Sequence, residues 1–327
     1  MCYDSFDSKI FSIVIPTFNE EIYIGRLVEH LLDLQVDNFQ IEVIVIDNGS
    51  TDKTLFILEN FPCTVKVLPG VTIAEMRNYG AGLAIGKWLG FVDADCFPVN
   101  NWAVLAKQEL ESDQMQGVVG SFYSLTTDVT WVELLWYSMR SATVGNVNFL
   151  PAGNMAVRHC EFLQFGGFPR DAITGEDYAL CERYISEGYS VVNNPKLKSM
   201  HYGNVKTLSG LFRKELWYGL SFKKSYKKNM LSKVFWATIV FLSGCLMFNI
   251  SLISMAIGNV MLTKLTLFFG LLSIIFVVVP YACIATIRSR TMMNFFGYIM
   301  IFFVYFLGRS AAVAKLSWSF LFGHINQ

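Results

Sequence analysis

Short apolar runs alternate with stretches of helical periodicity over the first ninety residues. Four short runs of apolar and β-branched or aromatic residues predict strands at 11–16, 41–46, 64–68 and 88–92. Between them, apolar residues recur at helical spacing, most clearly over 24–32. Strands that alternate with helices indicate right-handed crossovers and a parallel sheet. The pattern therefore predicts an α/β domain.

The next hundred residues are less regular. Turn formers interrupt the apolar runs, and the segment 149–157 mixes turn and strand character. The expected elements are helices at 101–111, 131–140 and 178–187 and strands at 117–123 and 189–193.

The last third of the chain is mostly apolar. No charged residue occurs from 234 to about 260, and a second such run covers 265–287. A third run, 295–314, is interrupted by Arg309. Each is long enough to span a bilayer. Lysines precede the first run and arginines follow the second, so the positive-inside rule places both ends in the cytoplasm.

Large apolar and basic residues are interspersed between the two parts, over 208–230. This composition favours a helix that lies in a membrane interface, although a surface helix of a soluble domain is the alternative. We therefore expect a cytoplasmic domain over 1–207, a basic amphipathic helix over 208–230 and a transmembrane region over 231–327.

The charge balance and the cysteines narrow the class of protein further. Lysine and arginine total 26, as do aspartate and glutamate, so a nucleic-acid partner has no overall electrostatic support. The seven cysteines are scattered without a C-x-x-C pair, which favours reduced thiols in a cytosolic domain. The N-terminus lacks the basic and apolar regions of a signal peptide, and none is expected.

Two carboxylates one residue apart, Asp93 and Asp95, follow the strand predicted at 88–92. Such a pair is tolerated in a solvated turn, or it binds a divalent cation. Ligands of parallel sheets bind at the carboxyl ends of the strands. The topology brings the loops 16–20 and 47–52 to the same edge as these carboxylates.

Six short motifs occur in an order that resembles the family 2 glycosyltransferases. These are inverting enzymes of the GT-A fold, and the resemblance covers roughly residues 10–220. Each motif alone is weak, whereas the ordered set is specific. The motifs read VIPTFNE at 14–20, DNGSTD at 47–52, RNYG at 77–80, DAD at 93–95, GNMAVR at 153–158 and GED at 175–177.

The resemblance implies a binding site for a nucleotide-sugar donor, with a UDP-sugar expected. Base and ribose would lie against the backbone of Pro16, Thr17 and Phe18, together with Glu20 and Asp47. Glu20 could instead be an acid favoured by the dipole of a helix N-terminus. Two arginines, Arg77 and Arg213, would contact the diphosphate, since arginine makes charge-assisted bonds to phosphate. The alternatives are an exposed surface arginine for Arg77 and a lipid-headgroup contact for Arg213.

The resemblance also implies a metal site and a general base. Asp93 and Asp95 would bind Mg²⁺ or Mn²⁺, with Asp93 also reaching the donor ribose. His201 is the candidate for a further ligand, although a lone histidine is often structural.

Inversion requires a carboxylate that takes the proton of the acceptor hydroxyl. Asp177 is the expected base, and Glu176 would orient the acceptor or Asp177 itself. Simple capping of a helix N-terminus is the alternative for both residues. Gly153 and Asn154 would line the acceptor side of the donor sugar.

We therefore expect a multi-pass protein of the inner membrane with its catalytic domain in the cytoplasm. It would transfer a sugar to a membrane-associated, polyprenyl-linked glycan in surface polysaccharide or glycolipid synthesis. A polyprenyl-phosphate glycosyltransferase is the alternative enzyme. A degenerate membrane assembly component is the non-enzymatic alternative, but the presence of Asp93, Asp95 and Asp177 argues against it. The processive motif Q-x-x-R-W is absent.

Overall fold

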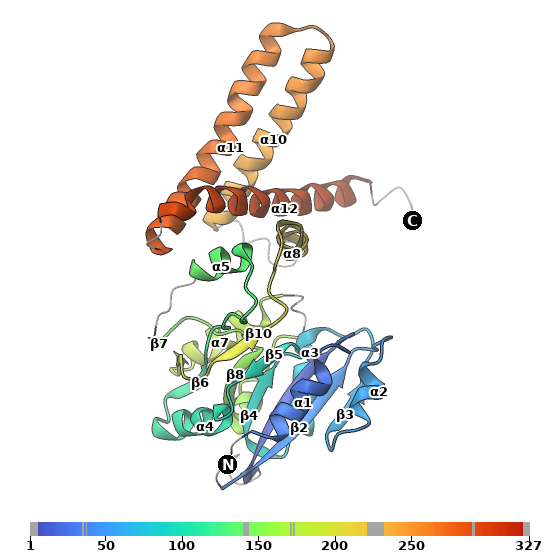
Figure 1. The fold of residues 1–327 in the computed structure, drawn as a ribbon, viewed down its shortest axis with the longest axis vertical. Helices are drawn as coiled ribbons and strands as arrows, with labels where there is room; N and C mark the ends of the chain where they lie inside the picture. The colour runs from blue at the N-terminus through green and yellow to red at the C-terminus, as the bar shows by residue number, and fades with distance from the viewer. Residues whose placement is uncertain are drawn as a thin grey trace. The chain divides into compact units, whose positions relative to one another are not determined.

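The structure, a computed structural model, describes residues 6–34, 36, 38–139, 144–170, 172, 174–220, 232–289 and 292–322. The chain divides into two compact units (Figure 1). The first contains residues 1–127 and 142–203, and the second contains 128–141 and 204–327. The domain expected over 1–207 differs from the first unit mainly by including 128–141.

One half of the main sheet in the first unit is parallel, as predicted. It consists of β1 (Asp7–Thr17), β2 (Gln40–Asp47), β3 (Thr64–Val67) and β4 (Gly86–Val92). Their spatial order is β3-β2-β1-β4. The register pairs Thr17 with Asp47, so the loops after β1 and β2 start side by side.

The other half of the sheet is mixed, which corrects the expectation of a parallel sheet. β8 (Asn154–Arg158) runs antiparallel between β4 and β6 (Gln116–Gly120). β9 (Ser190–Asn193) is parallel to β6, and β7 (Gly145–Asn146) closes the edge. The pairing of β4 with β8 sets Val92 opposite Asn154, which carries the segment before β8 to the end of β4.

A second, two-stranded sheet was not predicted. It pairs β5 (Cys96–Pro98) antiparallel with β10 (Ser199–His201). The register sets His201 opposite Cys96, and this small sheet thereby brings the late histidine beside the two carboxylates.

Helices cover both faces of the main sheet, and each face has its own apolar core. Residues of α1 (Ile24–Leu32), α2 (Thr54–Leu58) and α4 (Trp102–Ser112) belong to one core. Residues of α3 (Ile73–Leu83), α6 (His159–Gln164) and α7 (Glu176–Ser186) belong to the other. The first unit is thus a three-layer α/β domain.

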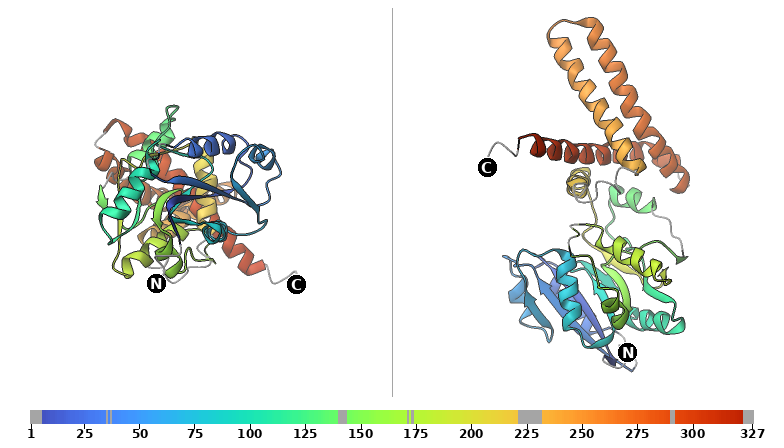
Figure 2. Two further views of the ribbon diagram at one scale, coloured as in Figure 1. Left: turned by 90° about the horizontal axis from the view of Figure 1, so that it is seen from below. Right: turned by 180° about the vertical axis from the view of Figure 1, so that it is seen from behind.

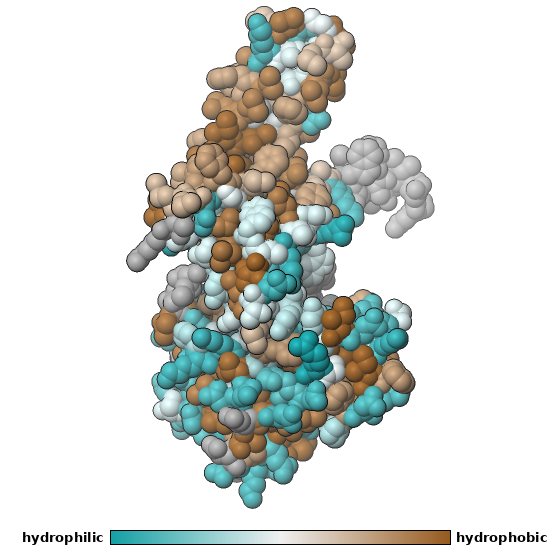
Figure 3. Space-filling view, viewed as in Figure 1, coloured by the Kyte–Doolittle hydropathy of each residue, from teal (hydrophilic) through white to brown (hydrophobic). Residues whose placement is uncertain are grey.

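The second unit is helical. α10 (Lys233–Ala256) and α11 (Val260–Ser289) form an antiparallel hairpin with an apolar surface (Figures 2 and 3). Gly244 and Gly270 allow the two backbones to approach closely, as small residues do in membrane helix pairs. After the short η2 (Met292–Asn294), α12 (Phe295–Phe322) follows. Within its described residues, the unit therefore has three helices long and apolar enough to cross a membrane, as the sequence predicts.

The described residues of this unit also form two shorter helices, α5 (Trp131–Ser138) and α8 (Leu208–Leu220). The basic helix expected over 208–230 is present as α8 up to Leu220, and residues 221–231 lie outside the described residues. α5 interrupts the sequence of the first unit but packs against α12, where Ser138 and Tyr298 share a hydrogen bond of 2.7 Å between their hydroxyls.

Candidate functional site

The loops after β1 and β2 are joined into one surface by hydrogen bonds. Asn19 N–H donates to Ser50 Oγ, and Thr51 N–H donates to Asn19 Oδ1, both over 2.8 Å. Asn19 has a φ of 56°, the left-handed conformation that asparagine tolerates better than most residues. Further along, Glu20 N–H donates to Thr54 Oγ1. The sequence predicted that these loops share an edge, and the structure shows that they support each other.

The residues expected to hold base and ribose differ in accessibility. Thr17 and Asp47 are buried, and Asp47 accepts bonds from the backbone N–H groups of Gly49 and Ser50. Asp47 therefore shapes its own loop. Phe18 is 52% exposed and presents a ring at the edge. Pro16 is buried within β1.

Glu20 lies in an acidic environment. Burial raises its pKa to about 7, and the neighbouring carboxylates of Asp95, Asp52 and Asp93 add to the effect. A cation close to these carboxylates would reverse that shift, because an opposite charge favours the ionised form. This arrangement departs from a simple acid at a helix N-terminus, since α1 begins only at Ile24.

Arg77 joins the strand-end carboxylates to the start of α7. Its guanidinium donates to Asp93 Oδ1 over 2.6 Å and to Glu176 Oε1 over 2.7 Å. Burial opposes the charge, but the two carboxylates outweigh it and hold the pKa of Arg77 above its ordinary value. Only 2% of Arg77 is exposed, so the alternative of an exposed surface arginine is wrong. Its contact with a diphosphate stays a prediction.

Asp93 has a second partner that sequence reasoning missed. The Tyr123 hydroxyl donates to Asp93 Oδ2 over 2.9 Å, so each oxygen of this carboxylate has a donor. The Tyr123 ring also stacks on His201, with 4.4 Å between ring centroids. The general signal for such a residue is an aromatic side chain near a strand end, which is too common to identify it in advance.

Asp95 and His201 form the pair best placed to bind a cation. His201 Nε2 lies 3.3 Å from Asp95 Oδ2. Burial disfavours the Asp95 charge, yet bonds from His201 and the backbone hold the pKa of Asp95 below its usual value. Cys96 completes a group whose ligand atoms lie within 4.8 Å of one another. Burial raises the pKa of the Cys96 thiol well above its usual value, so it remains a thiol that donates to Asp95.

Two glycines leave room around these carboxylates. A Cβ at Gly203 would overlap Asp95 Oδ2 and approach His201 Nε2, and a Cβ at Gly153 would overlap Asp93 Oδ2. Asp95 and His201 offer one carboxylate oxygen and one imidazole nitrogen, a pair of donor atoms that suits a divalent cation. The residues present therefore fit the predicted Mg²⁺ or Mn²⁺.

Asn154 is fully buried and its amide is engaged on every side. Its Oδ1 accepts from the Trp102 indole, and its Nδ2 donates to the carbonyls of Ser121 and Leu197. In this structure the Asn154 side chain does not line a surface, which corrects the expected acceptor contact. It locks β8 to its neighbours and so fixes Gly153 against Asp93.

Asp177 lies in the first turn of α7, after Gly175 at the N-cap with a φ of 78°. Burial and the adjacent Glu176 raise the pKa of Asp177 to about 6, against the opposing charge of Arg77. A carboxylate with such a pKa is suited to accept a proton near neutral pH. Glu176 is committed to Arg77, so it orients the turn that carries Asp177.

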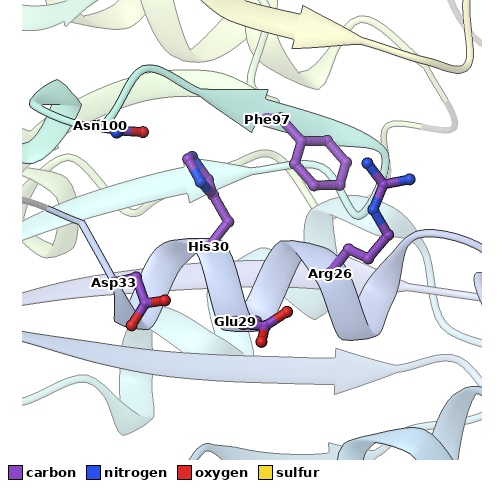
Figure 4. A pocket seen from close by; sticks show the side chains of 6 residues that line it. All are labelled: Arg26, Glu29, His30, Asp33, Phe97 and Asn100. Atoms are coloured by element: carbon purple, nitrogen blue, oxygen red, sulfur yellow. The ribbon is translucent and has the colours of Figure 1, made fainter.

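Two further features are a predicted arginine of the second unit and a surface pocket of the first unit. Arg213 is on α8 in the second unit, and its predicted role stays a prediction. A surface pocket between α1 and β5 is shown in Figure 4. Its lining contains no residue that the sequence assigned to the site: Arg26, Glu29, His30, Asp33, Phe97 and Asn100.

Comparison with known proteins agrees with the sequence resemblance. The model of the family described as glycosyl transferase family 2 matches residues 12–167. A Methanococcus voltae protein is 24% identical over 217 residues, which is 58% of this chain and 66% of that protein. Its name is dolichyl N-acetyl-alpha-D-glucosaminyl phosphate 3-beta-D-2,3-diacetamido-2,3-dideoxy-beta-D-glucuronosyltransferase. Glycosyltransferase AglE of Haloferax volcanii is 25% identical over 55% of this chain and 62% of its own length.

The fold has a counterpart among solved structures. Mannosyltransferase PcManGT from Pyrobaculum calidifontis, in complex with GDP-Man and Mn²⁺, superposes with a TM-score of 0.60 at 16% identity. The match covers 95% of this chain and 87% of that one. The expected fold is confirmed. Residues 12–167 therefore match the glycosyl transferase family 2 model, and the described residues combine a GT-A-like domain with three long apolar helices.

Proposed function

We propose that this chain is an inverting, metal-dependent glycosyltransferase that transfers one sugar from a nucleotide-sugar to a lipid-linked acceptor. The observation that carries the proposal is the arrangement around Arg77. The buried guanidinium of Arg77 connects Asp93, next to the Asp95–His201 pair, with the turn that holds Asp177. A donor-side metal site and an acceptor-side base are thereby coupled within one unit.

Asp95 and His201 would hold the cation, and the absence of a side chain at Gly203 lets the Asp95 carboxylate lie beside His201. When bound, the metal supplies neutralisation of the charge that develops on the leaving nucleotide diphosphate. Phe18 and the joined loops at 17–21 and 50–54 bind the nucleotide, and Tyr123 and Arg77 fix the Asp93 carboxylate toward the ribose. The role of these residues is to position the donor before the glycosidic bond breaks.

Asp177 takes the proton from the acceptor hydroxyl as its oxygen attacks the anomeric carbon. The attacking oxygen approaches from the side opposite the nucleotide diphosphate, which inverts the configuration. Glu176 pairs with Arg77 and keeps Asp177 in place.

The acceptor and the cellular location are inferred from the helical unit and the relatives. An enzyme with apolar helices of this length is anchored in a bilayer, where lipid-linked acceptors reside. The relative from Methanococcus voltae is named for a dolichyl-phosphate-linked acceptor. By the positive-inside rule the catalytic unit lies in the cytoplasm, at the inner membrane. A UDP-sugar is the donor we favour, and polyprenyl phosphate itself is the alternative acceptor.

The test uses the purified full chain in lipid vesicles with Mn²⁺, a panel of nucleotide-sugars and polyprenyl-linked acceptors. Release of nucleotide diphosphate that requires both a donor and a lipid acceptor is the expected result. Release with polyprenyl phosphate alone would identify the alternative enzyme. Absence of transfer with every donor and acceptor, from a folded protein that binds no nucleotide-sugar, would contradict the proposal.

Activity is expected to fall as the pH decreases through about 6. Burial and Glu176 raise the pKa of Asp177 to that value, and only the ionised carboxylate accepts a proton. Below it, each further pH unit lowers the ionised fraction about tenfold. The turnover rate at saturating substrate, measured between pH 5 and 8, checks this. A rate that stays constant down to pH 5 would contradict the assignment of Asp177.

Replacement of Arg77 by glutamine is expected to destabilise the first unit. The change leaves Asp93 and Glu176 without their shared cation, and breaking a buried pair costs about 3–5 kcal/mol. At about 2–4 °C per kcal/mol, the melting temperature should fall by at least about 6 °C. Lys107→Gln is the matched control, because it removes the outer i,i+4 pair with Glu111 and the contacts of the lysine with the Phe39 and Trp88 rings but leaves the buried ion pairs intact. Equal melting temperatures for Arg77→Gln and the unchanged chain would refute the structural role.

A further inference from the structure

α12 is long enough to cross a bilayer, yet it does not run alongside the α10–α11 hairpin. In Figure 1 and in the right view of Figure 2 it crosses the hairpin steeply, near the end where α10 begins and α11 ends. A third membrane span would normally pack along its neighbours at a small crossing angle. The direction of α12 therefore needs a different explanation.

The apolar contacts of α12 agree with this view. The core cluster of the second unit contains Phe241 of α10 and residues 277–285 of α11, together with Tyr298 and Phe306 of α12. All of these hairpin residues belong to the same end. Large side chains of the opposite end, such as Leu252 and Leu265, are about half exposed. Among the described residues, α12 thus covers one end of the hairpin and leaves the rest to lipid.

α12 carries a charged residue, Arg309, at a position unfavourable for a membrane-spanning helix. Arg309 lies near the middle of the 28-residue helix. At the centre of a bilayer an arginine costs about 2.5–3.5 kcal/mol even on insertion scales. Its Nε donates to Glu215 Oε2 of α8 over 2.8 Å, and Glu215 is buried. A spanning α12 would have to carry this ion pair into the hydrocarbon core.

α8 fixes the depth of α12 because the two helices are in close backbone contact. A Cβ at Gly308 of α12 would meet the Phe212 carbonyl of α8, and one at Gly219 of α8 would overlap Ala312. α8 contains three consecutive charged residues, 213–215, and lysines follow it in the sequence. Such a segment does not enter the hydrocarbon core, so the part of α12 that it contacts does not either.

One face of α12 is left for lipid. Phe296, Met300, Phe303 and Leu307 are 36–77% exposed, although all four are large and apolar. They recur at i, i+4, i+7 and i+11, which places them in one stripe along the helix. Arg309, Gly308 and Ala312 face α8 instead. A helix with one apolar face and an opposite charged neighbour is typical of the plane of a membrane interface.

We propose that α12 lies in the membrane interface, with its 296–307 stripe in the boundary between headgroups and acyl chains. Among the described residues, only α10 and α11 then cross the bilayer, and the end of α12 stays on the side where α10 begins. The inference rests on the proposed membrane location of the hairpin. Lipid covers the 296–307 stripe, and this lipid is continuous with the lipid that surrounds α10 and α11.

The depth of paired positions distinguishes the two arrangements. A keto-bearing phenylalanine analogue, placed at position 296 or 307 and coupled to a nitroxide, leaves the native cysteines unchanged. The full chain is inserted in vesicles of phosphatidylethanolamine and phosphatidylglycerol, and the depth is measured from oxygen and nickel-chelate relaxation. The same label at positions 265 and 276 of α11 is the control. Both pairs are 11 residues apart, or about 16 Å along a helix.

We expect the labels at 296 and 307 to lie at similar depth and the labels at 265 and 276 to differ. Even at a 40° tilt, a spanning helix would separate its pair by about 12 Å or more in depth. Such a difference between 296 and 307 would overturn the inference. Equal depths for 265 and 276 would refute the membrane location of the hairpin instead, which is a separate failure.

A fusion after Gln327 gives an independent measurement for labelled variants that fail to fold. A green fluorescent protein should fluoresce and an alkaline phosphatase should be inactive, since both would remain in the cytoplasm. An active phosphatase with a dark fluorescent protein would place the C-terminal end outside and overturn the inference.

Discussion

Asp177→Asn is expected to lower the turnover rate by about 100- to 10,000-fold while donor binding changes little. A positioned general base contributes about that factor, and asparagine has nearly the same shape but accepts no proton. Asp177 belongs to α7, whereas the Asp95–His201 pair lies at the β5–β10 sheet. The turnover rate and the dissociation constant of the donor, measured separately, show whether the loss is confined to the chemical step.

Glu182→Gln provides the matched control for this change. Glu182 is exposed on the same helix and differs from Asp177 in lying more than one turn away from the N-terminus. Its replacement should leave the turnover rate within about twofold, as for most surface changes. Retention of full activity by Asp177→Asn would remove this residue from catalysis and leave Glu176 as the remaining carboxylate of the turn.

The second large effect is expected for the Asp95–His201 pair, the candidate ligands of the metal ion. Asp95→Asn removes the charged ligand, and we expect activity to fall by about 100-fold or more at any Mn²⁺ concentration. Several kcal/mol of transition-state stabilisation depend on the metal, and each 1.36 kcal/mol is a factor of ten. Unlike Asp177→Asn, this change should also weaken donor binding, since the cation that would neutralise the diphosphate loses a charged ligand.

Two control variants distinguish loss of metal binding from a general disturbance of the fold. Asp33→Asn alters an exposed aspartate of the same unit, and His30→Asn alters a histidine outside the cluster. Both should keep Mn²⁺-dependent donor binding, whereas Asp95→Asn and His201→Asn should lose it. Calorimetric titration of the nucleotide-sugar, with Mn²⁺ or with a chelator, measures this. Donor affinity that is equal with Asp95→Asn and with the unchanged chain would exclude the site.

The predictable part of the fold follows from local signals. The runs before Pro16, Asp47 and Asp93 are apolar, and such runs determine both the strands and the edge at which their loops meet. The antiparallel insertion of β8 depends on pairing between β4 and a segment more than sixty residues later, for which no local pattern exists. The same holds for β10, because its partner β5 has only three residues.

The candidate site shows the same division. Asp93, Asp95 and Asp177 could be named from motifs. The ion pair between Arg77 and Glu176 could not be predicted, because the two residues are 99 positions apart and meet only through the packing of α7 against the sheet. Asn154 illustrates the opposite error: the motif marks the residue, but burial turns it from a contact into a support.

The excursion of residues 128–141 into the helical unit has a practical meaning for anyone who wishes to work with the catalytic half alone. The polypeptide passes between the two units three times, near 127, 141 and 203. A soluble fragment cut after 207 would retain α5 but lose the helices that cover Leu135, which is 5% exposed in the whole protein. Such a fragment would expose an apolar surface around Leu135 and would aggregate. A stable fragment would also need a short polar loop in place of 128–141. Cleavage by a protease near residue 204 alone would therefore not separate the first unit from the helical unit.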